Sequence, residues 1–171
     1  MRTSILCVAL LGLTACATST HDRKMEGVAL LEQGKANEAQ AYLDANGDTD
    51  DPATQLVRAQ AAQEAGDYET AITVYRNELK RALRPGVEQF ALVNLAAALR
   101  AVGQTDEAYS TMQRLERLRP NSEEVQRVMG ALAMEQGQIE LARLHFGRLG
   151  PEGRESVMNE VGGDFFAVDS Q

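Results

Sequence analysis

The chain repeats one spacing of residue types four times, and this repeat limits the fold more than any other feature. In each unit a small residue is followed by Gly seven positions later, by Ala five positions after that, and by a bulky apolar residue four positions further on. The four units are Gly27–Gly34–Ala39–Leu43, Ala59–Gly66–Ala71–Tyr75, Ala96–Gly103–Ala108–Met112 and Gly130–Gly137–Ala142–Phe146. Successive units begin 32, 37 and 34 residues apart. A period in the thirties with helical offsets predicts helical hairpins stacked side by side.

Each position of the repeat has a physical reason. Two antiparallel helices joined by a short turn come close at one crossing, so the first position and the Ala must be small. The Gly ends the first helix because it adopts the left-handed conformation without steric cost. The bulky residue lies one turn beyond the Ala on the same helix face and fills the seam. The four prolines follow the units, where proline stops a helix or opens the next one; they are Pro52, Pro85, Pro120 and Pro151.

The repeat resembles the tetratricopeptide repeat. The second unit reads Gly66-Asp67-Tyr68-Glu69-Thr70-Ala71, against Gly-Asp-Tyr-x-x-Ala in that family, and the third carries Asn94-Leu95-Ala96, Gly103, Ala108 and Arg119-Pro120. No unit has the early Trp of the family, and the first unit has Glu26 where Leu is usual. The resemblance covers roughly residues 21–150. It implies an all-α fold, a right-handed superhelical stack of about four helix-turn-helix units (an α-solenoid).

The pattern predicts where the helices lie. We expect paired helices at 23–33 and 37–44, 53–65 and 67–83, 87–102 and 105–118, and 123–136 and 139–149. Asn121 and Glu124 have capping-box spacing before the seventh of these helices. A helical stack exposes an apolar end that needs a cap, and a short helix at 152–161 with Val157, Met158 and Val161 would provide one. Phe165-Phe166 would then fold back on the stack or form a docking motif.

The first fifteen residues have the pattern of a sorting signal. Arg2 supplies a positive charge, and Ile5 to Leu13 form an apolar run far shorter than the ~20 residues of a membrane-spanning helix. The run ends in Leu13-Thr14-Ala15-Cys16, which resembles the bacterial lipoprotein box. This resemblance implies that Cys16 becomes the lipidated first residue, and Ala17 after it favours the outer membrane. The alternatives are an ordinary secretory signal, or Cys7 and Cys16 as packed apolar residues.

These signals divide the chain into four segments. Residues 1–15 are the predicted signal peptide, 16–22 the lipidated Cys and a short tether, 23–150 the repeat domain, and 151–171 a capping helix with a Gly-rich acidic tail. Cys7 falls in the signal peptide, so the remaining chain has no disulfide framework. Helix stacking must then provide its stability.

Charge and residue types exclude several functions. The net charge of −8 disfavours nucleic-acid binding, which requires a basic face. The two histidines, His21 and His145, have no second His or Cys at ligand spacing, so we expect no metal site and no cofactor. The glycines are helix ends rather than a phosphate loop, and no serine elbow is present. We therefore expect that the protein is not an enzyme.

One acidic segment imitates the start of a calcium loop. Asp44, Asn46 and Asp48 have the right spacing, but Thr49 stands where the sharp turn needs Gly and Gln55 where the loop needs Glu. The simpler interpretation is a solvated turn in which Asp51 caps the next helix and Pro52 is its first residue.

The family resemblance also implies a binding groove. Its concave face is lined by residues three, six and ten positions before the turn Gly of each first helix. In this sequence the positions that such a groove would use are Lys24, Val28, Leu31, Leu56, Gln60, Gln63, Val93, Ala97, Arg100, Arg127, Ala131 and Met134. The groove would be apolar, and Arg100 and Arg127 could face a carboxylate of a bound peptide. Alternatively, these residues pack against the tail of the chain.

The resemblance favours a protein-interaction adaptor on the periplasmic face of the bacterial outer membrane, anchored at Cys16. Among such adaptors, the chain most resembles the repeat lipoproteins of tight-adherence (Flp) pilus assembly and the pilotins that help secretin rings form. An adaptor for cell-wall enzymes and a small-molecule binder that uses the groove are the alternatives, and a structural homo-oligomer is a third possibility.

Overall fold

The computed structural model describes residues 19–48, 50–81, 83–162 and 165, and these residues form nine α-helices and no strand. The helices are α1 (Thr20–Glu32), α2 (Ala36–Asn46), α3 (Pro52–Glu64), α4 (Tyr68–Glu78), α5 (Pro85–Ala101), α6 (Thr105–Leu118), α7 (Glu123–Glu135), α8 (Ile139–Gly147) and α9 (Pro151–Val161). The all-α prediction is therefore confirmed. The predicted signal peptide, Cys16 and Phe166 lie outside the described residues.

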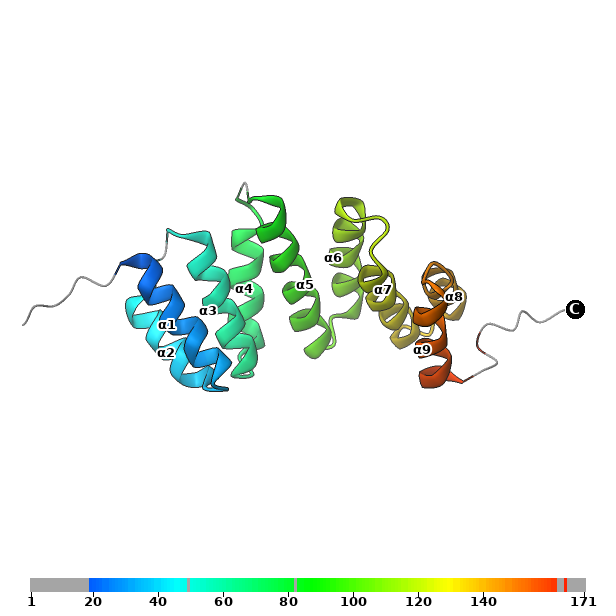
Figure 1. Ribbon diagram of the computed structural model, residues 1–171, viewed down its shortest axis with the longest axis horizontal. Helices are drawn as coiled ribbons and strands as arrows, with labels where there is room; N and C mark the ends of the chain where they lie inside the picture. The colour runs from blue at the N-terminus through cyan, green and yellow to red at the C-terminus, as the bar shows by residue number, and fades with distance from the viewer. Residues whose placement is uncertain (1–18, 49, 82, 163–164, 166–171) are drawn as a thin grey trace, which may run out of the picture.

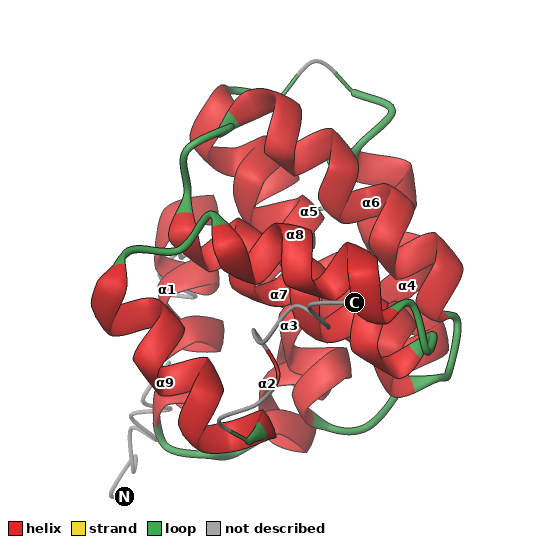
Figure 2. Ribbon diagram, turned by 90° about the vertical axis from the view of Figure 1, so that its right-hand side faces the viewer, coloured by secondary structure: helices red, strands yellow, loops and turns green. Residues whose placement is uncertain are grey.

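The helices follow one another along an elongated, curved stack from α1 to α9 (Figure 1). Hairpins α1–α2, α3–α4, α5–α6 and α7–α8 are the four predicted units, and each packs on the next. The odd-numbered helices α1, α3 and α5 also contact one another in sequence. Seen from the α9 end, α8 and α9 lie in front of α7 (Figure 2).

The repeat residues have the predicted roles. Gly34, Gly66, Gly103 and Gly137 have φ values of +72°, +87°, +76° and +71°, the left-handed conformation that ends each first helix. The small and bulky residues meet at the helix crossings. A Cβ atom on Gly27 would lie 2.7 Å from Cδ2 of Leu43, so no larger residue fits there without movement.

The core runs along the stack between the two rows of helices. Its largest cluster joins α3, α4, α5, α6 and α7, and it includes Tyr75, Leu92 and Met112, which are all almost fully buried. At the C-terminal end α9 contributes Val157, which is 2% exposed, as the predicted cap. The ring of Phe165 packs edge-on against Phe146 with 5.7 Å between centroids, so this residue folds back on the stack.

Two predicted helix ends were wrong by three residues or more. Helix α1 begins at Thr20 rather than residue 23, because Ser19 and Asp22 form a reciprocal capping box; residues 20–22 therefore belong to the helix and not to the tether. Helix α4 ends at Glu78 rather than 83. After Glu78 the amides of Lys80 and Arg81 donate to the carbonyls three residues before them, so tight turns replace the α-helical hydrogen bonds there.

A further correction concerns the N-cap of α7. Its N-cap is Ser122, whose Oγ accepts a hydrogen bond from the amide of Val125, and not the predicted Asn121. Ser122 is the residue directly before the first helical turn, so its side chain is the one within reach of the free amide groups there.

The acidic segment before α3 is a capped turn. Asp51 accepts hydrogen bonds from the amides of Ala53 and Thr54, and Pro52 is the first helical residue, as predicted. Asp44 forms an ion pair with Arg58 of α3. Among the described residues there is no group of three or more His, Cys, Asp or Glu that could hold a metal. None of the described helices is both long and apolar enough to cross a bilayer.

Candidate binding groove between helices α5 and α7

A small apolar cavity of about 130 Å³ lies between α5 and α7, with α6 beneath it. It is lined by Gln89, Val93, Ala96, Ala97 and Arg100 of α5, Met112 and Leu115 of α6, and Glu124, Val125, Val128 and Leu132 of α7. An apolar cavity of similar volume in another protein accommodates benzene. The space therefore fits one large apolar side chain.

The cavity exists because α5 and α7 are separated and because α5 has the small residues Ala96 and Ala97 where it lines the space. Earlier odd-numbered helices pack directly on one another, whereas α5 and α7 have at most isolated contacts. Ala97 lies at the repeat position that Gln60 holds in α3 and Val28 holds in α1. A longer side chain at position 97 would fill part of the space.

Arg100 closes one end of the cavity in an ion pair. Its Nε donates a hydrogen bond of 2.7 Å to Oε1 of Glu135, the last residue of α7. This hydrogen bond raises the pKa of Arg100. Glu135 thus supplies the carboxylate that we expected from a bound peptide, and Arg100 acts as a link between α5 and α7.

Arg127 does not stand free in the groove either. Its guanidinium donates a 3.2 Å hydrogen bond to Oγ of Ser156 in α9. The capping helix therefore takes up the second predicted arginine, and the pair of arginines does not form the expected carboxylate site.

The other predicted groove residues are spread over the stack. Leu31 and Leu56 are only 9% and 3% exposed and belong to the core, which corrects their assignment to an accessible groove. Lys24 forms an ion pair of 3.9 Å with Asp51. Gln60 donates to Glu64 across one helical turn.

Among the remaining predicted positions, Val28, Gln63, Ala131 and Met134 are half-buried and do not line the cavity. Of the predicted groove residues, only Val93, Ala97 and Arg100 therefore line the cavity. Sequence reasoning missed Gln89, Glu124 and Val128, because it followed a single stripe on each helix. These residues could have been predicted, because each lies three or four positions from a residue of the stripe and is therefore its neighbour on the helix surface.

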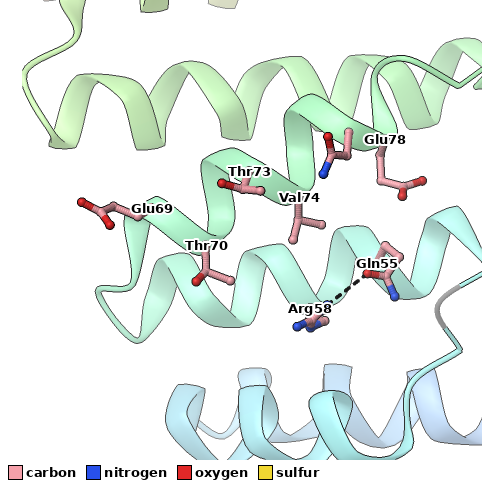
Figure 3. A pocket seen from close by; sticks show the side chains of 8 residues that line it. Gln55, Arg58, Glu69, Thr70, Thr73, Val74 and Glu78 are labelled. Atoms are coloured by element: carbon pink, nitrogen blue, oxygen red, sulfur yellow. Dashed lines mark hydrogen bonds between the residues drawn. The ribbon is translucent and has the colours of Figure 1, made fainter.

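A larger hollow of about 510 Å³ lies between α3 and α4 and is polar. Figure 3 shows Gln55 and Arg58 on α3, and Glu69, Thr70, Thr73, Val74 and Glu78 on the neighbouring α4. Two of its charged groups already have partners, because Arg58 pairs with Asp44 and Glu78 pairs with Arg81. Its volume is larger, but it offers no enclosed apolar surface to a ligand.

Comparison with known proteins identifies the family to which this fold belongs. A family model described as tetratrico peptide repeat matches residues 52–142, more than half of the chain. No curated protein sequence matches it. MamA is similar in structure, with a TM-score of 0.71 and 17% identity over 86% of this chain and 85% of that chain. PilF of Pseudomonas aeruginosa has a TM-score of 0.67 and 16% identity, with 88% and 73% covered.

The APC/C hetero-tetramer Cut9–Hcn1 is also similar, with a TM-score of 0.68 and 19% identity over 86% of this chain but only 29% of that chain. At these identities the similarity is one of fold.

Proposed function

Because this chain belongs to the tetratricopeptide repeat family, whose members generally bind proteins, we propose that it is a non-catalytic interaction scaffold that binds its partner in the groove between α5 and α7. The observation that supports this proposal is the apolar cavity between these helices. The partner inserts one large apolar side chain between Val93 and Val128. Burying such a side chain contributes roughly 1.5–3 kcal/mol.

The rim of the cavity determines how the bound segment lies. Gln89 and Glu124 line it together with the apolar residues and offer an amide and a carboxylate to the backbone of the segment. The Arg100–Glu135 pair closes the other end and is neutral overall. A short peptide or helix with one apolar anchor fits this arrangement better than a strongly charged one.

The proposed location is the periplasmic face of the bacterial outer membrane. Its support is the segment Leu13-Thr14-Ala15-Cys16, where lipidation of Cys16 would anchor the chain. The scaffold would then assist assembly of an envelope machine, such as a Flp pilus or a secretin. The similarity to PilF is one of fold and is compatible with this role. An adaptor for cell-wall enzymes uses the same groove and the same anchor.

The first experiment fills the cavity. Ala97→Phe places a ring in the space that the partner needs, at an exposed position of α5. Ala41→Phe is the matched control, because Ala41 is also an exposed alanine, in α2, and lines none of the hollows described here. We expect a crosslinked pull-down from membranes to lose its specific partner with Ala97→Phe and to keep it with Ala41→Phe. Recovery of the same partner with both variants would show that the groove is not the binding site.

A second experiment separates the anchor from the groove. Cells expressing the protein are labelled with radioactive palmitate, and we expect incorporation that Cys16→Ala abolishes. Equal labelling of both proteins contradicts lipidation at Cys16 and leaves the groove proposal to its own test. For the small-molecule alternative, a metabolite library that raises the melting temperature only with an intact cavity would be the supporting result.

A further inference from the structure

A second groove lies on the opposite side of the stack from the apolar cavity. It runs between the even-numbered helices α4 and α6, and Leu92 and Leu95 of α5 form its floor. Its volume is about 470 Å³. Because α4 and α6 belong to the other row of helices, a ligand here would not touch the cavity between α5 and α7.

The walls of this groove are basic, although the whole chain carries a net charge of −8. Four cationic residues line it and one carboxylate, that of Glu107, faces them. The cations are Arg76 of α4, Lys80 in the turn that follows α4, and Arg114 and Arg117 of α6.

Two of the four cations are neutralised within the protein. Arg76 donates to Glu107 at 2.6 Å, which links α4 to α6. Arg114 donates through Nε to Glu88 of α5 at 3.0 Å. These pairs fix the walls of the groove and leave no net charge.

The other two cations have no carboxylate partner in the described part of the chain. Nζ of Lys80 contacts only the neutral side-chain oxygen of Asn77, at 3.1 Å. Arg117 is exposed and forms no ion pair or hydrogen bond there. The groove therefore has a surplus of two positive charges on opposite walls.

The repeat places these two cations at equivalent positions. Lys80 follows Tyr75 by five residues, and Arg117 follows Met112 by five residues, so each stands beyond the same repeat position in adjacent units. The corresponding residues of the outer units are Asp48 and Pro151. The charge surplus is thus confined to the two middle units.

Neighbouring hollows differ in charge. The one between α3 and α4 has two carboxylates, Glu69 and Glu78, against one arginine. The one beside α6, α7 and α8 shares Arg117 with the groove between α4 and α6. It adds Arg148 and two carboxylates, Glu116 and Glu123, so it has no basic surplus of its own. Glu116 pairs there with Arg148 and not with Arg117. A basic surface is therefore not a general property of this side of the stack.

We propose that the groove between α4 and α6 is a second binding site, and that it takes an acidic segment of a partner protein. Lys80 and Arg117 bind carboxylates of the segment from the two walls, and the half-buried Leu79 contacts one of its apolar side chains. A membrane surface or a nucleic acid is disfavoured, because such an extended polyanion would also meet the acidic remainder of the protein.

The test uses full-length protein and a fluorescein-labelled twelve-residue peptide of glutamate and leucine, with a lysine–leucine peptide as the control ligand. We expect the anisotropy of the acidic peptide to rise on binding and the affinity to fall as salt increases. Lys80→Glu with Arg117→Glu should weaken binding at least about tenfold, since it replaces attraction by repulsion.

The matched control reverses two other exposed cations, with Lys35→Glu and Arg154→Glu, at the α1–α2 turn and in α9. It changes the net charge equally and should keep the peptide bound. Lys80→Gln with Arg117→Gln provides a milder second variant if the reversal lowers the melting temperature. Ala97→Phe should also keep the peptide bound, which separates this proposal from the proposed function.

Three results would overturn the inference. The full-length protein does not bind the acidic peptide, or it binds it equally well after the double reversal. In the third, vesicles containing phosphatidylglycerol, and not the peptide, lose affinity for the Lys80→Glu/Arg117→Glu variant, which would assign the groove to a membrane surface.

Discussion

Gly130 of α7 lies directly against the ring of Phe146 in α8: a Cβ atom on Gly130 would come within 2.6 Å of Cδ1 of Phe146. Gly27 and Leu43 have the same relationship in the first unit. In the third unit Ala96 takes the place of the glycine, and the residue four positions after the second-helix alanine is the flexible Met112. In the first and fourth units the glycine is therefore matched to the bulky residue of the second helix.

Gly130→Ala tests this matching. Alanine favours a helix interior over glycine by about 1 kcal/mol, so an unconstrained position would gain stability. Here the added methyl group must displace the Phe146 ring, and overpacking costs about 1–3 kcal/mol. We expect a net loss in the free energy of unfolding, measured by chemical denaturation. Phe146→Met in the same background recreates the Ala96–Met112 pair and should recover part of the loss; a stabilised single variant would contradict the matching.

Much of the fold could be predicted from such positions. The turn glycines, the small residues at the crossings and the first-residue prolines are set by backbone geometry within one hairpin, so their spacing is visible in the sequence. The ends of helices were less predictable, because they depend on competition between helical hydrogen bonds and the hydrogen bonds of caps and turns. Ser19 extends α1 by its capping box, and the tight turns formed by the amides of Lys80 and Arg81 shorten α4.

The candidate site was predicted only in part. Val93, Ala97 and Arg100 line the cavity together, on the face of α5 that the family resemblance implied. The Arg100–Glu135 pair and the separation of α5 from α7 depend on how two units pack, and no residue spacing records that. The basic surplus at Lys80 and Arg117 arises because α4 and α6 line the same groove, and the sequence alone does not show this arrangement.

The buried Tyr75 and the half-buried Tyr109 should respond in opposite ways to loss of the hydroxyl group. In the described part of the chain the hydroxyl of Tyr75 has no hydrogen-bond partner, whereas that of Tyr109 lies 2.8 Å from Nε2 of His145. Tyr75→Phe removes an unsatisfied polar group and should be neutral or stabilising by up to about 1 kcal/mol. Tyr109→Phe leaves the imidazole nitrogen unpaired and should cost about 1–3 kcal/mol. Thermal and chemical denaturation compare the two, and a reversed order would contradict the hydrogen-bond assignment.

His145 predicts a loss of stability in mild acid. Its side chain is 3% exposed, and Nδ1 lies 2.8 Å from Oε1 of Gln126. Burial lowers the pKa of His145 below its usual value of 6.5; the positive charge of Arg148 lowers it too, while Glu116 opposes them. The unfolded chain therefore binds a proton at a higher pH than the folded chain. Stability should be complete above about pH 6.5 and fall as the pH drops below that value, by about 1.4 kcal/mol for each unit of pKa difference.

Denaturant titrations between pH 8 and pH 5.5 measure this dependence before most carboxylates titrate. His145→Gln keeps a polar side chain but cannot take up the proton, so its stability should be lower at pH 8 and nearly constant over this range. An equal decline in both proteins would assign the acid sensitivity to another group.

Asp51 and its neighbour Asp50 provide the last test, at the joint between the first two units. Asp51 caps α3 through the amides of Ala53 and Thr54, whereas the side chain of Asp50 forms no such bond in the described structure. Asp51→Ala should lower the free energy of unfolding by about 0.5–2 kcal/mol, and Asp50→Ala by much less, although both remove one negative charge. The same proteins decide between a capped turn and a calcium loop. If calcium raised the melting temperature of the wild type and Asp51→Ala had no effect without it, the turn interpretation would be wrong.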